Sequence, residues 1–197
     1  MIKQRILGHF QQSAELKMQS AATLAAPIAA AVELMFTALS NGNRIFACGD
    51  GGSAAECCYF AAQLVGCFER ERLPLPAMAL TTDCSIMSGI GENGEGKAVY
   101  ARQIQAFGQS GDILLVMSES GNAPDVVAAM EAASERDMRV VAVTGKGGGV
   151  MASLLSEDDV SICVPHDRNA RIREVNSLII HCLCDGIDVA LFGGDAE

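Results

Sequence analysis

Apolar and polar residues alternate in blocks from residue 44 toward the C-terminal end of the chain. Some blocks, such as residues 113–117 and 140–143, are continuously apolar, which is typical of strands that are covered on both faces. The blocks between them repeat apolar residues at helical spacing. The predicted strands are residues 44–48, 77–80, 112–117, 139–144 and 159–164, and the predicted helices are residues 53–68, 97–107, 123–136, 148–155 and 169–191. This alternation predicts an α/β fold, doubly wound around a five-stranded parallel sheet.

The first forty residues follow a different pattern. Residues 2–41 contain one glycine, Gly8, and one proline, Pro27, and their apolar residues recur every three or four positions. This spacing predicts two helices, the second ending at Asn41. We expect one domain over residues 1–197, with a helical extension at 1–42 and an α/β core at 43–197. The extension must bury its apolar faces, which favours packing against other subunits.

Composition narrows the function classes. Half of the residues are hydrophobic and 19% are charged, which is enough for a substantial core. The formal charge is −10 without a basic tract, which argues against direct nucleic-acid binding. No apolar stretch looks long and charge-free enough to span a membrane, and the N-terminus lacks the features of a signal peptide. The eight cysteines show no metal-type CxxC pair, so we expect reduced thiols in a cytoplasmic protein.

A glycine-rich stretch follows the first predicted strand. Residues 49–53 read Gly-Asp-Gly-Gly-Ser and lead into a helix, with Ser53 as its expected N-cap. Glycines permit a sharp turn and close approach of a ligand, and a helix N-terminus attracts anions. A plain strand-to-helix turn explains the same residues equally well. The stretch has neither the lysine of a P-loop nor the glycine spacing of a dinucleotide site.

Similar loops follow the other predicted strands. They are residues 81–83, 118–122 and 144–149, which are rich in hydroxyl groups and glycine. Each alone is a plausible turn. Because the carboxyl ends of parallel strands meet at one edge of a sheet, the loops together predict a site for an anionic small molecule. The residues expected to bind this small molecule are Gly51, Gly52, Ser53, Asp83, Ser118, Ser120, Gly121 and Asn122.

These motifs, together with residues 143–146 (Val-Thr-Gly-Lys) and 171–175 (Arg-Ile-Arg-Glu-Val), resemble the SIS (sugar isomerase) domain family, in that family's order and over nearly the whole chain. Two branches of the family look most similar: the phosphoheptose isomerases and the DnaA initiator-associating proteins. The resemblance implies a three-layer, flavodoxin-like sandwich with a helical bundle, assembled as a homotetramer. It also implies that the anionic ligand is a sugar phosphate.

The residues that would hold zinc in the related isomerases differ in this chain. The isomerases carry a histidine and a glutamate where this chain has Tyr59 and Gln63, and a glutamine where it has Arg173. The family's catalytic histidine is matched by His181. Tyrosine, glutamine and arginine make a poor zinc site at neutral pH. We therefore expect no metal cofactor, and His181 either acts as the one remaining catalytic residue or packs at a subunit interface.

The phosphate loop differs as well. The corresponding loop of the isomerases is similar to Ser-Thr-Ser-Gly-Asn-Ser. In this chain the loop is residues 118–123, with Glu119 in the second position and Ala123 in the last. A carboxylate that faced the phosphate would oppose its binding, and one that faced outward would have little effect. Both orientations remain open at this point.

The C-terminal residues 182–192 resemble the initiator-associating branch. There a Leu-Phe pair contacts the replication initiator, and Leu191 and Phe192 match that pair. The alternative is that both side chains simply dock the end of the last helix.

The resemblance to this branch, with the lost ligands, predicts a non-catalytic tetramer that binds the replication initiator DnaA or a regulatory sugar phosphate. It also predicts no isomerisation, with or without zinc. The alternative is a working phosphoheptose isomerase, which converts sedoheptulose 7-phosphate to D-glycero-D-manno-heptose 7-phosphate, with Glu56 or Asp83 as an unfamiliar base. A third interpretation is an SIS effector domain whose DNA-binding partner lies on another chain.

Overall fold

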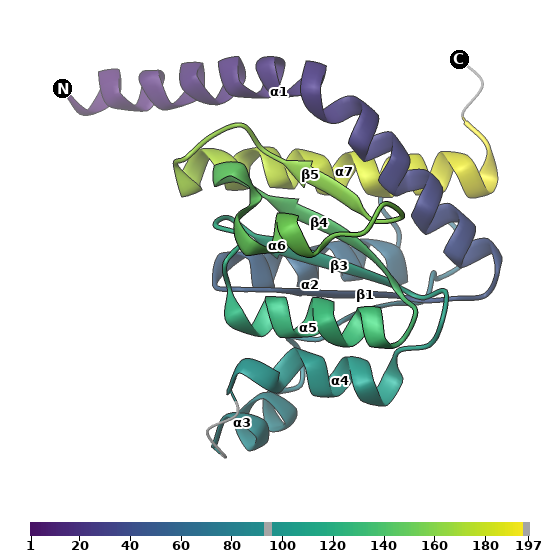
Figure 1. The fold of residues 1–197 in the computed structure, drawn as a ribbon. Coiled ribbons are helices and arrows are strands. Elements are labelled where there is room, and N and C mark those ends of the chain that lie inside the picture. Colours follow the sequence, from purple (N-terminus) through teal and green to yellow (C-terminus); the bar gives the residue numbers. More distant parts are fainter. Residues whose placement is uncertain (93–95, 195–197) are drawn as a thin grey trace.

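A five-stranded, all-parallel sheet forms the middle layer of the computed structural model, which describes residues 1–92 and 96–194 (Figure 1). The strand order is β2-β1-β3-β4-β5. The strands are β1 (Ile45–Gly49), β2 (Ala77–Ala79), β3 (Ile113–Ser118), β4 (Arg139–Thr144) and β5 (Val160–Cys163). Each bound lies within one residue of the prediction, and the α/β class with five parallel strands is confirmed.

Helices cover both faces of the sheet (Figure 1). They are α1 (Ile2–Ser40), α2 (Gly52–Val65), α3 (Cys84–Glu92), α4 (Val99–Phe107), α5 (Pro124–Glu135), α6 (Gly149–Leu154) and α7 (Asn169–Phe192), with 3₁₀ turns at Gly96–Ala98 and Lys146–Gly148. Helices α1, α2 and α7 share one face, and α4 and α5 pack on the other. Helix α3 was not predicted, because its nine residues include Gly89 and Gly91 and none of them is buried.

The prediction of two N-terminal helices is wrong. A single helix, α1, runs from Ile2 to Ser40 through Pro27. Proline removes one helical hydrogen bond and bends the helix, and Figure 1 shows α1 changing direction along its length. The helix continues because one face stays buried on both sides of the proline: Leu16, Ser20, Leu24, Ala31, Met35 and Ala38.

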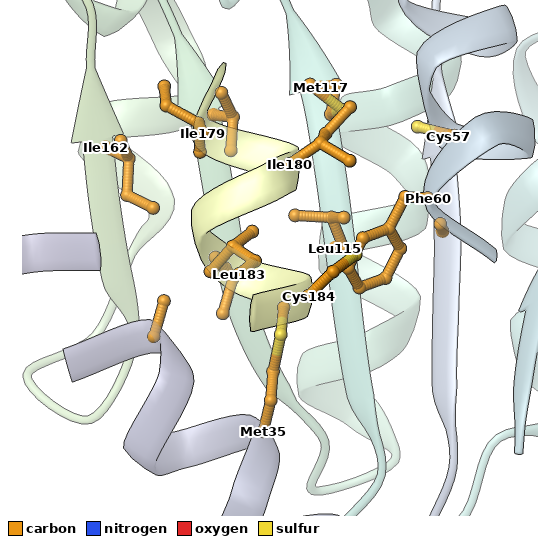
Figure 2. Packing of buried hydrophobic residues seen from close by; sticks show 14 of the residues in the cluster. Met35, Cys57, Phe60, Leu115, Met117, Ile162, Ile179, Ile180, Leu183 and Cys184 are labelled. Carbon is orange, nitrogen blue, oxygen red and sulfur yellow. The ribbon is translucent and has the colours of Figure 1, made fainter. Parts of the chain in front are cut away.

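The larger core lies between the sheet and α7. Odd-numbered residues of β3 point to this face and even-numbered ones to the other, as strand geometry requires. Figure 2 shows Ile179, Ile180, Leu183 and Cys184 of α7 packed among Leu115 and Met117 of β3, Phe60 of α2 and Met35 of α1. This packing fixes α7 beside α2, and the candidate site lies along the line where these two helices meet.

Helices α1 and α7 are both long and apolar enough to cross a membrane by length and composition, contrary to the expectation from sequence. Core helices of folded proteins pass the same test. Because α7 contributes Ile179, Ile180 and Leu183 to the core, the feature is weak evidence of a membrane location.

Candidate active site

Three loops meet at the carboxyl edge of the sheet, as the sequence predicts. In the parallel register Gly49 lies beside Met117, and Ser118 lies beside Thr144. The loops after β3 and β4 are joined by two hydrogen bonds. The amide of Met151 donates to the carbonyl of Gly121 at 3.0 Å, and the amide of Val150 donates to Asn122 Oδ1 at 2.9 Å. The two loops therefore form one unit.

The start of α2 differs from the prediction in one respect. Gly51, with φ of +52°, is the N-cap, and Ser53 lies inside the first turn with its side chain fully buried. Ser53 is therefore not the capping residue. Gly52 has a second role, because a Cβ at this position would clash with the guanidinium of Arg173. The glycine turn thus lets a side chain of α7 approach the N-terminus of α2.

Glu119 points toward α7. Its buried carboxylate forms an ion pair with Nε of Arg173, whose side chain is 44% exposed. The hydrogen bond from Arg173 to Glu119 raises the pKa of the guanidinium. The extra carboxylate of this loop is therefore neutralised by a neighbouring cation, and the open question about its orientation is answered.

Glu56 lies on α2, one helical turn after Gly52. Asn176 Nδ2 of α7 donates to its Oε2 at 3.2 Å. Burial raises the pKa of the Glu56 carboxyl above its ordinary value, the Asn176 hydrogen bond and Arg173 lower it, and the charge of Glu119 raises it. The net direction is upward, so this carboxyl takes up a proton at higher pH than an exposed glutamate does.

Tyr59 and His181 form the next contact along the same two helices. The Tyr59 hydroxyl and His181 Nε2 are 3.0 Å apart, and the rings meet edge to face. Phe68 stacks at a tilt on the imidazole, with ring centroids 5.5 Å apart. Gln63 follows one turn after Tyr59, and its backbone carbonyl accepts a hydrogen bond from Arg72.

The residues present do not fit the zinc ion that the family resemblance implies. The hydroxyl of Tyr59 is hydrogen-bonded to the only imidazole of this group, and Arg173 brings a positive charge. Within residues 1–92 and 96–194, no cluster of three or more His, Cys, Asp and Glu side chains could hold a metal. That the protein works without a metal cofactor stays a prediction.

The phosphate loop is partly closed on itself. Ser118 is fully buried, and its Oγ accepts from the amide of Gly121 at 3.3 Å. Ser120 Oγ accepts from the amide of Asn122 at 3.2 Å. Ser120 is half-buried and Asn122 is exposed, so these two residues present the outer surface of the loop.

Three further predicted site residues have other contacts. Asp83 is exposed and caps α3, accepting from the amides of Ser85 and Ile86 at 2.9 and 3.0 Å. Leu191 packs partly buried against the core, whereas Phe192 is 42% exposed, with the Arg70 guanidinium 5.8 Å from its ring centroid. The structure does not bring these three residues to the α2–α7 line.

Several buried oxygen atoms at this edge have no hydrogen-bond partner within the described part of the chain. They are Asp50 Oδ1, Ser53 Oγ, Thr144 Oγ1 and Asn176 Oδ1. Buried polar groups are normally paired, so these atoms favour a polar ligand or ordered water here. Sequence reasoning missed Asn176, although its spacing of three from Arg173 puts it on the same helix face.

Comparisons with known proteins agree over almost the full length. The SIS domain model matches residues 9–145. The phosphoheptose isomerase of Bordetella avium is 54% identical over 193 residues, which are 98% of each chain. The solved structure of the phosphoheptose isomerase of Neisseria gonorrhoeae has a TM-score of 0.91 at 42% identity, covering 95% of this chain and 99% of that one. The enzyme of Francisella tularensis has a TM-score of 0.90 at 35% identity, covering 95% and 98%.

These relatives correct the functional prediction. The expectation of a non-catalytic partner of the replication initiator is wrong, because the full-length relatives are isomerases rather than initiator-associating proteins. The prediction that the chain is not an enzyme fails for the same reason. The resemblance to phosphoheptose isomerases is confirmed, and the chain belongs to the SIS domain family.

Proposed function

We propose that this protein is an aldose–ketose isomerase that acts on a phosphorylated sugar, as the phosphoheptose isomerases do. The observation that carries this proposal is the 54% identity to such an isomerase over 98% of both chains. The substrate suggested by the family is sedoheptulose 7-phosphate.

The loops at the carboxyl edge support this proposal. A phosphate would face Ser120 and Asn122 at the outer surface of the loop after β3, near the N-terminus of α5. Ser53 would contribute from the first turn of α2, where its side chain is buried. Glu119 does not oppose an anion, because Arg173 neutralises it. The sugar carbons would then extend toward the line between α2 and α7.

The proposal is tested by turnover with a series of ketose phosphates of five, six and seven carbons. We expect the purified protein to convert the seven-carbon substrate to the aldose and the shorter ones more slowly, because the relatives are named for heptose. If a folded preparation converts none of them, the proposed function is wrong. The fold is checked in the same sample by circular dichroism.

We also propose that the protein is a homotetramer in the cytoplasm. Ile2, Ile6, Phe10 and Met18 of α1 are between 50% and 77% exposed, an apolar surface that a single chain leaves in water. All eight cysteines are free, as expected in a reducing compartment.

Replacing Ile6 and Phe10 together by glutamate should break this assembly. Charges placed on an apolar interface must be desolvated, so the subunits should separate into smaller species. Light scattering after size exclusion measures the mass. Gln4→Glu adds a charge on another side of the same helix and should leave the mass unchanged. An unchanged mass in the double variant would show that this surface is not an interface.

A further inference from the structure

We propose that Glu56 is the base that moves the proton between the two carbons, and that Arg173 is the fixed cation beside the oxygens that become negative. This inference rests on the proposed isomerase function and adds how the site performs it. It assigns to two side chains of this chain the roles that, by the family resemblance, a carboxylate at the position of Gln63 and a zinc ion would have.

Three contacts between α2 and α7 set the positions of these groups. The Arg173 guanidinium lies against Gly52, Asn176 donates to Glu56, and His181 meets Tyr59. On α2 these positions are spaced by four and three residues, so they lie on one face of the helix. Glu56 is therefore between the cation and the Tyr59–His181 pair, with about one helical turn, 5.4 Å, to either side.

Arg173 is placed to act as the cation. Its Nε is committed to Glu119, which fixes the side chain in place. Its terminal nitrogens lie beside Gly52 at the N-terminus of α2, where a larger residue would clash with them. The side chain is 44% exposed, so a ligand at the carboxyl edge can reach it. A held guanidinium can stabilise developing negative charge without rearranging during the reaction.

Glu56 is placed to act as the base. One of its oxygens accepts from Asn176, and that amide has its own oxygen unpaired among the described residues. Of the other acidic side chains near the edge, Glu119 is paired with Arg173 and Asp83 caps α3. Asp50, in the turn before α2, has one buried oxygen without a partner among the described residues, but it does not lie on α2 between Gly52 and Tyr59. Burial and the nearby charge of Glu119 favour the protonated form more than in water, as suits a carboxylate that must hold a proton transiently.

The chemistry balances without an added reagent. The Glu56 carboxylate takes a proton from C1 of the ketose, the C–H electron pair forms the C1=C2 bond, and the carbonyl pair moves onto O2 beside Arg173. The proton of the O1 hydroxyl passes to O2 through the Tyr59 hydroxyl, which is hydrogen-bonded to His181. Protonated Glu56 then gives its proton to C2 while the O1 electron pair forms the aldehyde C=O. One hydrogen has moved between neighbouring carbons and one between oxygens.

The test compares Glu56→Gln with wild type, using sedoheptulose 7-phosphate and chelator-treated protein. Glutamine keeps the size and can still contact Asn176, but it cannot take a proton. We expect kcat to fall by about 10²–10⁴-fold while calorimetric affinity for the ketose is unchanged. Glu56→Asp should keep part of the activity. Glu131→Gln, the same change on an exposed position of α5, should have no effect.

The outcomes separate this inference from the proposed function. If wild type shows no turnover, the isomerase proposal itself fails. If wild type is active and Glu56→Gln is equally active, only the assignment of the base is overturned. Arg173→Gln should lower kcat with or without zinc. Activity that chelation abolishes and zinc restores, or that Arg173→Gln increases, would contradict the role given to Arg173.

Discussion

Replacing Arg72 by methionine should lower the free energy of unfolding by about 3–5 kcal/mol, because it leaves Asp188 as a buried charge without its partner. Arg72 Nε lies 2.5 Å from Asp188 Oδ1, and the two side chains are 2% and 4% exposed. The guanidinium also donates to the carbonyls of Leu64 and Gln63 at 2.8 and 2.9 Å. The Arg72 side chain therefore joins the end of α2 to α7. Denaturant unfolding of the Arg72→Met variant should measure the loss of stability.

A matched control is available on the surface. Arg139 pairs with Asp158 at 2.9 Å, but the two side chains are 45% and 67% exposed. Arg139→Met should cost only about 0–1 kcal/mol, as exposed pairs do. The double variant Arg72→Met with Asp188→Leu should recover part of the loss, since it removes the unpaired charge. Equal losses for the two single variants would contradict the view that burial makes the Arg72 pair important.

Replacing Gly121 by alanine should damage both the fold of the phosphate loop and its binding. Gly121 has φ of +66°, where a residue with a Cβ is disfavoured by about 1–2 kcal/mol. Its Cβ would also clash with the carbonyl of Gly148 in the neighbouring loop. We expect a loss of stability greater than the φ penalty alone and weaker calorimetric binding of sedoheptulose 7-phosphate.

Gly147→Ala separates the two causes. Gly147 has φ of +78°, but no atom outside its own neighbourhood lies within 4 Å of a Cβ placed there. It should therefore show the φ penalty without the clash, and retain sugar-phosphate binding. If both alanine variants bind and unfold alike, the contact between the two loops has no part in the site.

The sheet could be predicted closely from sequence because its central strands, β1, β3 and β4, are buried on both faces and contain continuous apolar runs. Every residue of β1 and β3 is buried, for example, and both had been located within one residue. Helix α3 gave no such signal, since none of its residues is fully buried. Two helices were predicted where α1 is one, because the packing of one continuous face against α7 outweighs the hydrogen bond that Pro27 removes.

The candidate site could be located from sequence but not assembled. The loop motifs were expected at the carboxyl edge of the sheet, and three of the loops meet there. Whether Glu119 faced the ligand depended on where Arg173 lay, and that required the packing of α7 beside α2. The functional prediction was wrong for a related reason. Because Tyr59, Gln63 and Arg173 replace the residues that would bind zinc, the sequence was interpreted as that of a protein without catalytic activity. In the structure Tyr59 and Arg173 belong to a row of charged and hydrogen-bonded side chains that includes Glu56 and Asn176.

The most direct test of the account is a proton NMR experiment in D₂O with wild-type protein and sedoheptulose 7-phosphate. An isomerase of this kind must take a proton from C1 and form the aldose. The account predicts that the aldose signals appear with time, and that deuterium enters at carbon whenever the proton on Glu56 exchanges with solvent before it is returned. A ketose spectrum that stays unchanged over the same period, with the protein still folded, would contradict the isomerase function.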